Sequence, residues 1–193
     1  MRATFAAARA FLVVTLALAL LSGCGSQEPD VRAPTPAQAR AELAGSPAAL
    51  ASLHREAAQL LDGGLDAYDA RLATLRGHPV VVNAWASWCG PCKYEMPFFS
   101  RAAVRFGRRV AFVGVNAGDL DRDKARAFLR DHYVPYPSYV DPHDEIADDV
   151  GVRAGLPTTV FYARDGEVAY VHQGRYRDED ALVADIGRYA GAS

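Results

Sequence analysis

The sequence predicts an α/β domain with a central mixed β-sheet flanked by helices. Two continuous apolar runs, 80–85 and 110–115, are typical of central strands that are covered on both faces. Each run is followed by a segment in which apolar residues recur at helical spacing. Near the C-terminus, the alternating runs 158–162 and 167–172 flank a glycine-containing turn at 164–166, which predicts a β-hairpin. This order, βαβα followed by ββα, predicts a mixed sheet between layers of helices.

The N-terminal segment has the composition of a signal peptide. Residues 1–23 carry Arg2 and Arg9, then an apolar run too short to span about 30 Å of hydrocarbon, and then small residues. The sequence at 21–24 (LSGC) resembles the lipobox of bacterial lipoproteins, in which the cysteine becomes the lipidated first residue. We therefore predict that Cys24 is lipidated and anchors the protein on the outer side of a membrane. Secretion without a lipid, with an incidental Cys24, is the alternative.

Three regions follow the predicted signal peptide. Residues 24–46 are small, polar and proline-containing, which predicts a flexible tether. Residues 47–64 predict a helical extension that is closed by Gly63 and Gly64 and packs on the domain that follows. That domain is predicted to span 65–193. The apolar positions at helical spacing in the extension are Leu50, Leu53, Ala57, Leu60 and Leu61.

The helices of the main domain alternate with its strands. Residues 91–106 predict a helix after the first strand, and residues 121–133 predict a second helix, capped by Asp121. A turn-rich stretch at 134–139 and a short helix at 142–150 come next. The last helix is predicted from the apolar residues Leu182, Val183, Ile186 and Tyr189.

Composition and charge exclude several classes of protein. With 21 basic and 23 acidic residues the formal net charge is -2, so no positive excess is present to neutralise a phosphate backbone, and nucleic-acid binding is not expected. Three cysteines are too few for a disulfide scaffold. No sequence repeat of about 20 to 50 residues is visible, which excludes solenoids and propellers.

Two of the cysteines lie where the first predicted strand meets its helix. Residues 88–93 (WCGPCK) place Cys89 and Cys92 one helical turn apart, a spacing that allows a dithiol to close reversibly. Cys89 lies at the helix N-terminus, where unpaired backbone N–H groups and the positive end of the helix dipole stabilise a thiolate. We therefore expect Cys89 to be the nucleophile and Cys92 to resolve the mixed disulfide.

Three other roles compete with redox chemistry at this dithiol. Zinc needs four ligands, and besides the dithiol the chain has only Cys24 and no histidines at pairing spacing. Covalent haem attachment requires a histidine after the second cysteine, where Lys93 stands. A permanent structural disulfide would close a loop of only a few residues, so its entropic contribution to stability would be small. We therefore expect a redox dithiol with no metal and no cofactor.

The residues around the dithiol resemble a known family. Residues 82–92 (VNAWASWCGPC), followed by 95–97 (EMP) and 155–159 (GLPTT), resemble the thioredoxin superfamily and, more narrowly, its membrane-attached TlpA/ResA/DsbE branch. The resemblance covers about residues 65–190. It implies a thioredoxin-like fold with the extra βα insertion of this branch, within 110–150.

The resemblance also implies a substrate-binding edge beside the dithiol. Pro157 corresponds to the cis-proline that faces the dithiol in this family, and a trans proline that starts a strand is the alternative. The backbone of Leu156 and Pro157 would pair with an extended substrate peptide. Trp88 is expected to shield the nucleophile and contact the substrate.

An acidic residue is expected to support proton transfer. Thioredoxin has a buried aspartate where this chain has Asn83, which cannot accept a proton. Glu95 lies three residues beyond Cys92, one turn along the same helix, so its carboxylate would approach the dithiol and exchange protons with Cys92. The alternative is a solvated surface glutamate, which is common for a lone helical Glu.

These observations predict an enzyme, a lipid-anchored thiol-disulfide oxidoreductase on the extracytoplasmic face of a bacterial membrane. The resemblance favours reduction of disulfides in exported proteins, such as apocytochrome c in cytochrome c biogenesis. Electrons would come from a membrane thiol carrier, because no nucleotide-binding motif is present. A disulfide-forming oxidant of the same fold and a non-catalytic binding lipoprotein are the alternatives. Peroxidase activity is disfavoured because Ala86 stands where a peroxidatic Thr-x-x-Cys motif has threonine.

Overall fold

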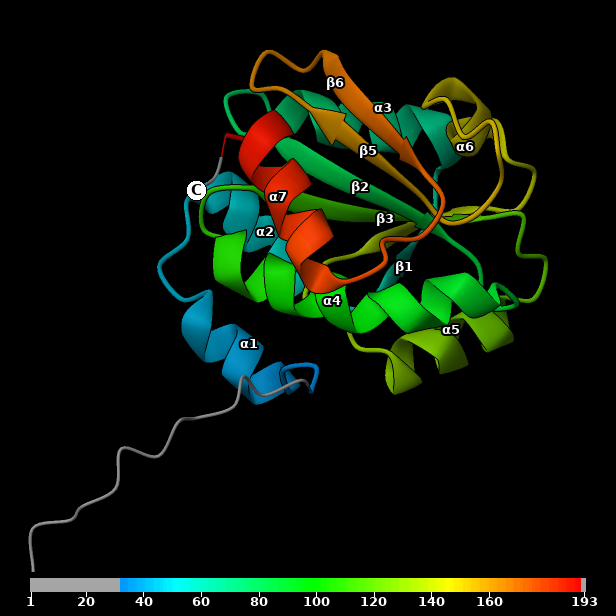
Figure 1. Ribbon diagram of the computed structural model, residues 1–193, viewed down its shortest axis with the longest axis horizontal. Helices are drawn as coiled ribbons and strands as arrows, with labels where there is room; N and C mark the ends of the chain where they lie inside the picture. Colours follow the sequence, from blue (N-terminus) through cyan, green and yellow to red (C-terminus); the bar gives the residue numbers. More distant parts are fainter. Residues whose placement is uncertain (1–31, 192–193) are drawn as a thin grey trace, which may run out of the picture. The chain divides into compact units, whose positions relative to one another are not determined.

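The computed structural model describes residues 32–191, and Figure 1 shows how their helices and strands are arranged. The predicted signal peptide, the predicted lipidation site Cys24 and the first part of the predicted tether lie outside the described residues. Within residues 32–191, no helix is long and apolar enough to cross a membrane. The expectations for the N-terminal segment therefore stay predictions.

A six-stranded mixed sheet lies at the centre of the described residues (Figure 1). Its strands are β1 (Leu60–Leu61), β2 (Val80–Trp85), β3 (Ala111–Ala117), β4 (Ser138–Asp141), β5 (Thr158–Tyr162) and β6 (Val168–Gln173). They are ordered β1-β4-β3-β2-β5-β6. The first four in this order are parallel, whereas β5 pairs antiparallel with β2 and β6 pairs antiparallel with β5. The predicted mixed sheet and its C-terminal hairpin are confirmed.

Helices cover both faces of this sheet (Figure 1). They are α1 (Pro36–Glu42), α2 (Ala48–Arg55), α3 (Gly64–Thr74), α4 (Gly90–Phe106), α5 (Arg122–Asp131), α6 (Glu145–Asp149) and α7 (Glu179–Tyr189). One hydrophobic core joins the sheet to α4, α5 and α7, and the other joins it to α2, α3 and α6. The segment 110–150, where the family insertion was expected, contains β3, α5, β4 and α6.

The side chains of the central strand β2 point alternately to the two faces of the sheet. All six of its residues are buried. Val81 and Trp85 belong to the core that contains α4. Val82 and Ala84 belong to the core on the other face. Because successive side chains of a strand point to opposite faces, Asn83 points to the face that α4 covers.

The N-terminal part of the domain differs from the sequence prediction. Residues 36–42, predicted as part of the tether, form α1, which begins with a capping box between Thr35 and Gln38. The predicted extension helix ends early, and residues 60–61 form β1 because they pair with β4. Gly63 does not end a helix but precedes α3, with a φ of 110° that favours glycine.

A further correction concerns β4. The stretch 134–139 was predicted to be turn-rich, but its last two residues begin a strand that lies between β1 and β3. The backbone N–H of Ser138 donates to the carbonyl of Gln59, and its side-chain oxygen accepts from the indole N–H of Trp85 at 3.1 Å. Pairing partners distant in the sequence therefore decide this strand, while the prolines before it indicate a turn.

Candidate active site

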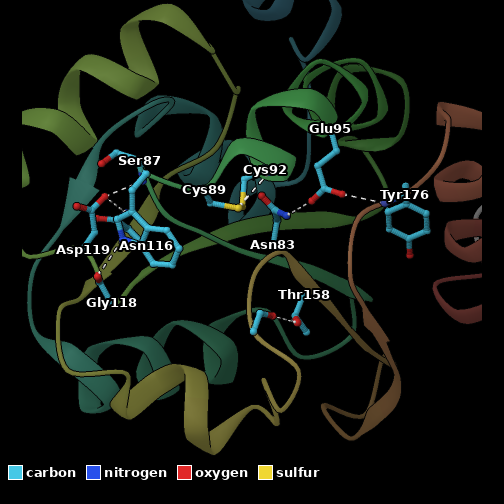
Figure 2. Close-up of a disulfide and its surroundings, with 12 residues drawn as sticks. Asn83, Ser87, Cys89, Cys92, Glu95, Asn116, Gly118, Asp119, Thr158 and Tyr176 are labelled. Atoms are coloured by element: carbon cyan, nitrogen blue, oxygen red, sulfur yellow. Dashed lines mark hydrogen bonds between the residues drawn. A yellow bond between two sulfur atoms is a disulfide. The ribbon is translucent and has the colours of Figure 1, made fainter.

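Both cysteines of the predicted dithiol lie at the start of α4, just beyond the carboxyl end of β2 (Figure 2). Cys89 is the N-cap residue of α4 and forms a disulfide with Cys92, with the two Cα atoms 5.3 Å apart. The backbone N–H of Cys92 donates to Cys89 Sγ at 3.2 Å. This contact and the helix dipole favour a thiolate on Cys89 once the bond is reduced. Cys89 is 3% exposed and Cys92 is fully buried, so Cys89 is the more exposed of the two residues.

Glu95 lies one turn beyond Cys92 on α4, and it is fully buried. Its Oε1 accepts a hydrogen bond from Asn83 Nδ2 at 3.1 Å, and its Oε2 accepts one from the backbone N–H of Tyr176 at 3.0 Å (Figure 2). Burial raises the pKa of Glu95 to about 7, while the two hydrogen bonds and the charge of Arg175 act in the opposite direction. The alternative of a solvated surface glutamate is therefore wrong, and the carboxyl titrates near neutral pH.

The neighbours of Glu95 keep its surroundings polar but uncharged on two sides. Asn83 reaches it from β2 and stays neutral at every pH. Tyr136, in the segment before β4, is buried, and burial followed by the negative charge of Glu95 raises the pKa of its hydroxyl well above the ordinary value. That hydroxyl therefore stays protonated in the range where Glu95 titrates.

The segment before β5 lies at the carboxyl end of β2, the end at which the dithiol is also found. Thr158 pairs in register with Ala84, near the end of β2. The preceding Leu156–Pro157 peptide bond is cis, as the resemblance implies, so the trans alternative is wrong. Pro157 is buried, and its carbonyl accepts from the backbone N–H of Gly174 at 2.9 Å. Leu156 is half-buried and packs against both hydrophobic cores.

Exposed apolar surface lies on the side of the dithiol that faces the segment after β3. Trp88 is 64% exposed, and its indole N–H donates to the carbonyl of Gly118 at 3.1 Å. Leu120 is 80% exposed. Both side chains line one groove of about 520 Å³, together with Lys93. The indole therefore stays accessible beside the nucleophile, in an orientation that its hydrogen bond holds.

Sequence reasoning misses two residues of the site. Asp119 is buried and accepts from the backbone N–H of Ser87 at 2.7 Å and from Asn116 Nδ2 at 3.1 Å (Figure 2). It fixes the connection between β2 and the dithiol, and its place just after a strand parallel to β2 is a signal that points to this edge. Tyr176 is 81 residues from Glu95 and contributes its backbone N–H, for which no side-chain pattern is a signal.

The structure thus brings most of the predicted site residues together. Cys89, Cys92 and Glu95 lie at the N-cap and in the first turns of α4, and Leu156 and Pro157 directly precede β5, which pairs with β2. The predicted lipidation site lies outside the described residues. The roles of these residues in catalysis stay predictions.

Comparisons with known proteins agree with this geometry. A model of the AhpC/TSA family matches residues 54–171. The thiol-disulfide oxidoreductase ResA of Geobacillus kaustophilus is 29% identical over 117 residues, which are 60% of this chain and 66% of that protein. ResA of Bacillus subtilis is 32% identical over 104 residues, which are 53% of this chain and 57% of that protein. The chain therefore spans less than two thirds of the length of these two relatives.

Solved structures show the same fold. The crystal structure of a secreted Mycobacterium tuberculosis disulfide oxidoreductase, described as homologous to DsbE of Escherichia coli, superposes with a TM-score of 0.54. It is 25% identical, and the match covers 60% of this chain and 85% of that one. The six-stranded sheet with helices on both faces is therefore thioredoxin-like.

Proposed function

This chain belongs to the AhpC/TSA family and has a thioredoxin-like fold, and from this premise we propose that it is a thiol-disulfide oxidoreductase that uses Cys89 and Cys92. The observation that carries the proposal is a disulfide at the N-terminus of α4, one turn from a buried carboxyl with a pKa of about 7. A permanent structural disulfide between residues three apart would add little stability. A redox-active cysteine, in contrast, benefits from a position at a helix N-terminus.

In the reducing direction, the Cys89 thiolate attacks one sulfur of a substrate disulfide. The Cys89–substrate bond forms, the substrate S–S bond breaks, and the released thiolate takes up a proton. Cys92 then gives its proton to Glu95, and its thiolate attacks Cys89 Sγ. The protein disulfide forms, the Cys89–substrate bond breaks, and the second substrate sulfur leaves as a thiolate that takes up a proton. Two electrons pass to the substrate, so a thiol donor must reduce the protein before the next turnover.

The pKa of Glu95 is suited to accepting the Cys92 proton in this reaction. A group that accepts and returns a proton works best when its pKa lies near the working pH, and burial places the pKa of Glu95 at about 7. In the reduced protein its titration would be shared with that of the nearby thiols. Glu95→Gln keeps the size of the side chain and removes the ionisation. We expect it to change the pH profile of cysteine alkylation, measured from about pH 5 to about pH 10. Superimposable profiles would exclude this role.

Two surfaces beside the dithiol would hold the substrate. Pro157 has no N–H and its carbonyl already accepts from Gly174, so the backbone of Leu156 is the better partner for an extended peptide. Trp88 would cover the other side with its exposed indole. These contacts would align a substrate disulfide with Cys89 Sγ.

The proposed location is the extracytoplasmic face of a bacterial membrane, with Cys24 lipidated. The signal-peptide composition of 1–23 supports export, and the lipobox-like sequence at 21–24 supports the anchor. The proposed substrates are disulfides of exported proteins, such as apocytochrome c, and the proposed electron source is a membrane thiol carrier. The similarity to proteins named thiol-disulfide oxidoreductase ResA supports thiol-disulfide exchange as the activity.

A disulfide-forming oxidant is the second candidate, and one contact favours it. The Cys92 N–H that donates to Cys89 Sγ would stabilise the thiolate of the reduced form, and a stabilised reduced form makes a stronger oxidant. Equilibration with glutathione measures the potential. A reduction potential of about −270 mV supports the reductase, and one of about −120 mV supports the oxidant.

Insulin reduction driven by a small thiol tests the activity itself. We expect turnover in the wild-type protein and complete loss in Cys89→Ser, because Cys92, the other cysteine among residues 32–191, is fully buried. Cys24→Ser is the matched control and should retain turnover, because the predicted lipidation site carries no dithiol chemistry. Absence of turnover in the wild type would favour a non-catalytic binding lipoprotein.

A further inference from the structure

The loop between β6 and α7, residues 174–178, presents the backbone amide that binds Glu95. Of these five residues only Tyr176 is buried, at 1% exposed. Its ring is therefore the anchor that inserts this loop into the core. Its backbone N–H donates to Glu95 Oε2 at 3.0 Å, so the ring and the amide of one residue connect the loop to the site (Figure 2).

The Tyr176 ring is held from three elements. Its hydroxyl donates to Asp185 Oδ2 on α7 at 3.0 Å. His172 on β6 stacks on it with the ring centroids 4.0 Å apart and the planes 10° apart, and Phe99 on α4 meets it at 6.3 Å. Burial, followed by the Asp185 carboxylate, raises the pKa of the Tyr176 hydroxyl above its ordinary value, so the hydroxyl stays a donor.

We propose that Tyr176, held by Asp185 and His172, is a positioning residue that sets the protonation equilibrium of Glu95. Fixing the ring fixes the amide, and an amide N–H aimed at a carboxylate favours its ionised form. A loosened ring would withdraw this donor and leave Glu95 with Asn83 alone, in a fully buried place. The consequence for catalysis rests on the proposed proton transfer between Glu95 and Cys92.

Other charged and titratable groups lie around Glu95 and the Tyr176 ring, among them Arg188 on α7, which interacts with the charges of Asp185 and Tyr170. Glu95 lies one turn beyond Cys92 on its own helix. Its charge interacts with Tyr136 before β4 and with Arg175 in the same loop as Tyr176. Arg175 is also held outside the site, with its guanidinium carbon 4.5 Å from the Tyr94 ring centre. Around the Tyr176 ring, His172 Nδ1 lies 3.7 Å from Asp185 Oδ2, and Tyr170 adds a phenol on β6. The donor to Glu95 that belongs to the same residue as the held ring is the Tyr176 amide, and Asp185 and His172 contact that ring.

A carboxyl ¹³C NMR titration of Glu95 in the full chain tests the proposal. The disulfide form is used because Cys89 and Cys92 then carry no titrating proton, and Glu95→Gln identifies the resonance. The wild-type midpoint is expected near 7. Tyr176→Ala should raise the midpoint by about one pH unit, because one hydrogen bond to the carboxylate is lost. Tyr176→Phe and Asp185→Ala should raise it less, because the ring remains.

Two controls separate positioning from general destabilisation. Asp185→Asn can still accept from the hydroxyl and should stay close to wild type. Tyr162→Phe removes a buried tyrosine hydroxyl that bonds to Tyr68 in the other core, and it should leave the midpoint unchanged. If Tyr176→Ala does not fold, the Glu95 midpoints of Tyr176→Phe and Asp185→Ala test the proposal. An unchanged Glu95 midpoint in both variants overturns the proposal.

Cysteine alkylation of the reduced protein separates this proposal from the proposed function. Tyr176→Phe should shift the pH profile in the wild-type background and have no further effect in a Glu95→Gln background, because it acts through Glu95. If Glu95→Gln leaves alkylation unchanged while the Tyr176 variants move the NMR midpoint, positioning stands and the proton-transfer role fails. If Glu95→Gln changes alkylation and the midpoint does not move in the Tyr176 variants, only positioning is wrong.

Discussion

Replacing Glu95 with glutamine should stabilise the folded protein at neutral and alkaline pH. Burial gives the carboxyl a pKa of about 7 in the folded protein, against an ordinary value of 4.5. Between these values the folded chain holds a proton that the unfolded chain has lost, so the stability of the wild type should fall as pH rises through this window. At about 1.4 kcal/mol per pH unit, this difference in pKa corresponds to about 3 kcal/mol.

Glutamine stays neutral at every pH and keeps a similar shape. The gain in unfolding free energy of Glu95→Gln over wild type should therefore grow between pH 4.5 and about 7 and stay constant above. Urea unfolding of both proteins in the disulfide form, across this range, measures the growth, because other titrating groups cancel in the difference. The exposed residue Glu167 gives the matched control Glu167→Gln.

A difference in stability that does not change with pH would refute this reasoning. It would mean that the Glu95 carboxyl titrates alike in the folded and unfolded chains, despite its burial between β2 and the loop before α7. A difference that grows in the same window for Glu167→Gln would locate the effect in the unfolded state instead.

Three further predictions follow from the site and the core. Cys92→Ser should trap a stable mixed disulfide with a substrate protein, because the resolving thiol is missing, and non-reducing electrophoresis detects it. Cys24→Ala should block lipid attachment in cells, whereas a purified 25–193 fragment should keep its dithiol chemistry in the insulin assay. Gly114→Ala should lower the free energy of unfolding by about 1–3 kcal/mol, because the new Cβ would overlap the Ser138 hydroxyl that binds the Trp85 indole; urea unfolding measures this.

The strands and helices around the dithiol could be predicted because their signals are local. The apolar run at 80–85 and the alternating run at 158–162 coincide with β2 and β5. The helix after the first strand begins at Gly90, within one residue of its predicted start. Asp121 caps α5 as predicted, with its side chain accepting from the backbone N–H of Lys124. In each case the residues that decide the element lie inside it or next to it.

The elements that were missed depend on partners elsewhere in the chain. β1 has only two residues, and it is a strand because Leu60 and Leu61 pair with β4. α1 lies in a stretch whose composition is typical of a tether, and it contacts α4 while burying Ala39. Composition over a window of residues does not report such contacts, so the tether was predicted too long.

The sequence by itself determined the chemistry of the dithiol. Two thiols three residues apart at a helix N-terminus are placed by neighbouring residues alone, and the helix dipole acts on the first of them whatever surrounds the helix. Only the tertiary structure decided the state of Glu95. Helical spacing predicted its distance from Cys92, but its burial, its bond to Asn83 and the amide of Tyr176 come from β2 and from a loop 81 residues away. The pKa of a carboxyl depends on desolvation and on the donors that meet it, and both are properties of the packed fold rather than of the helix that carries the residue.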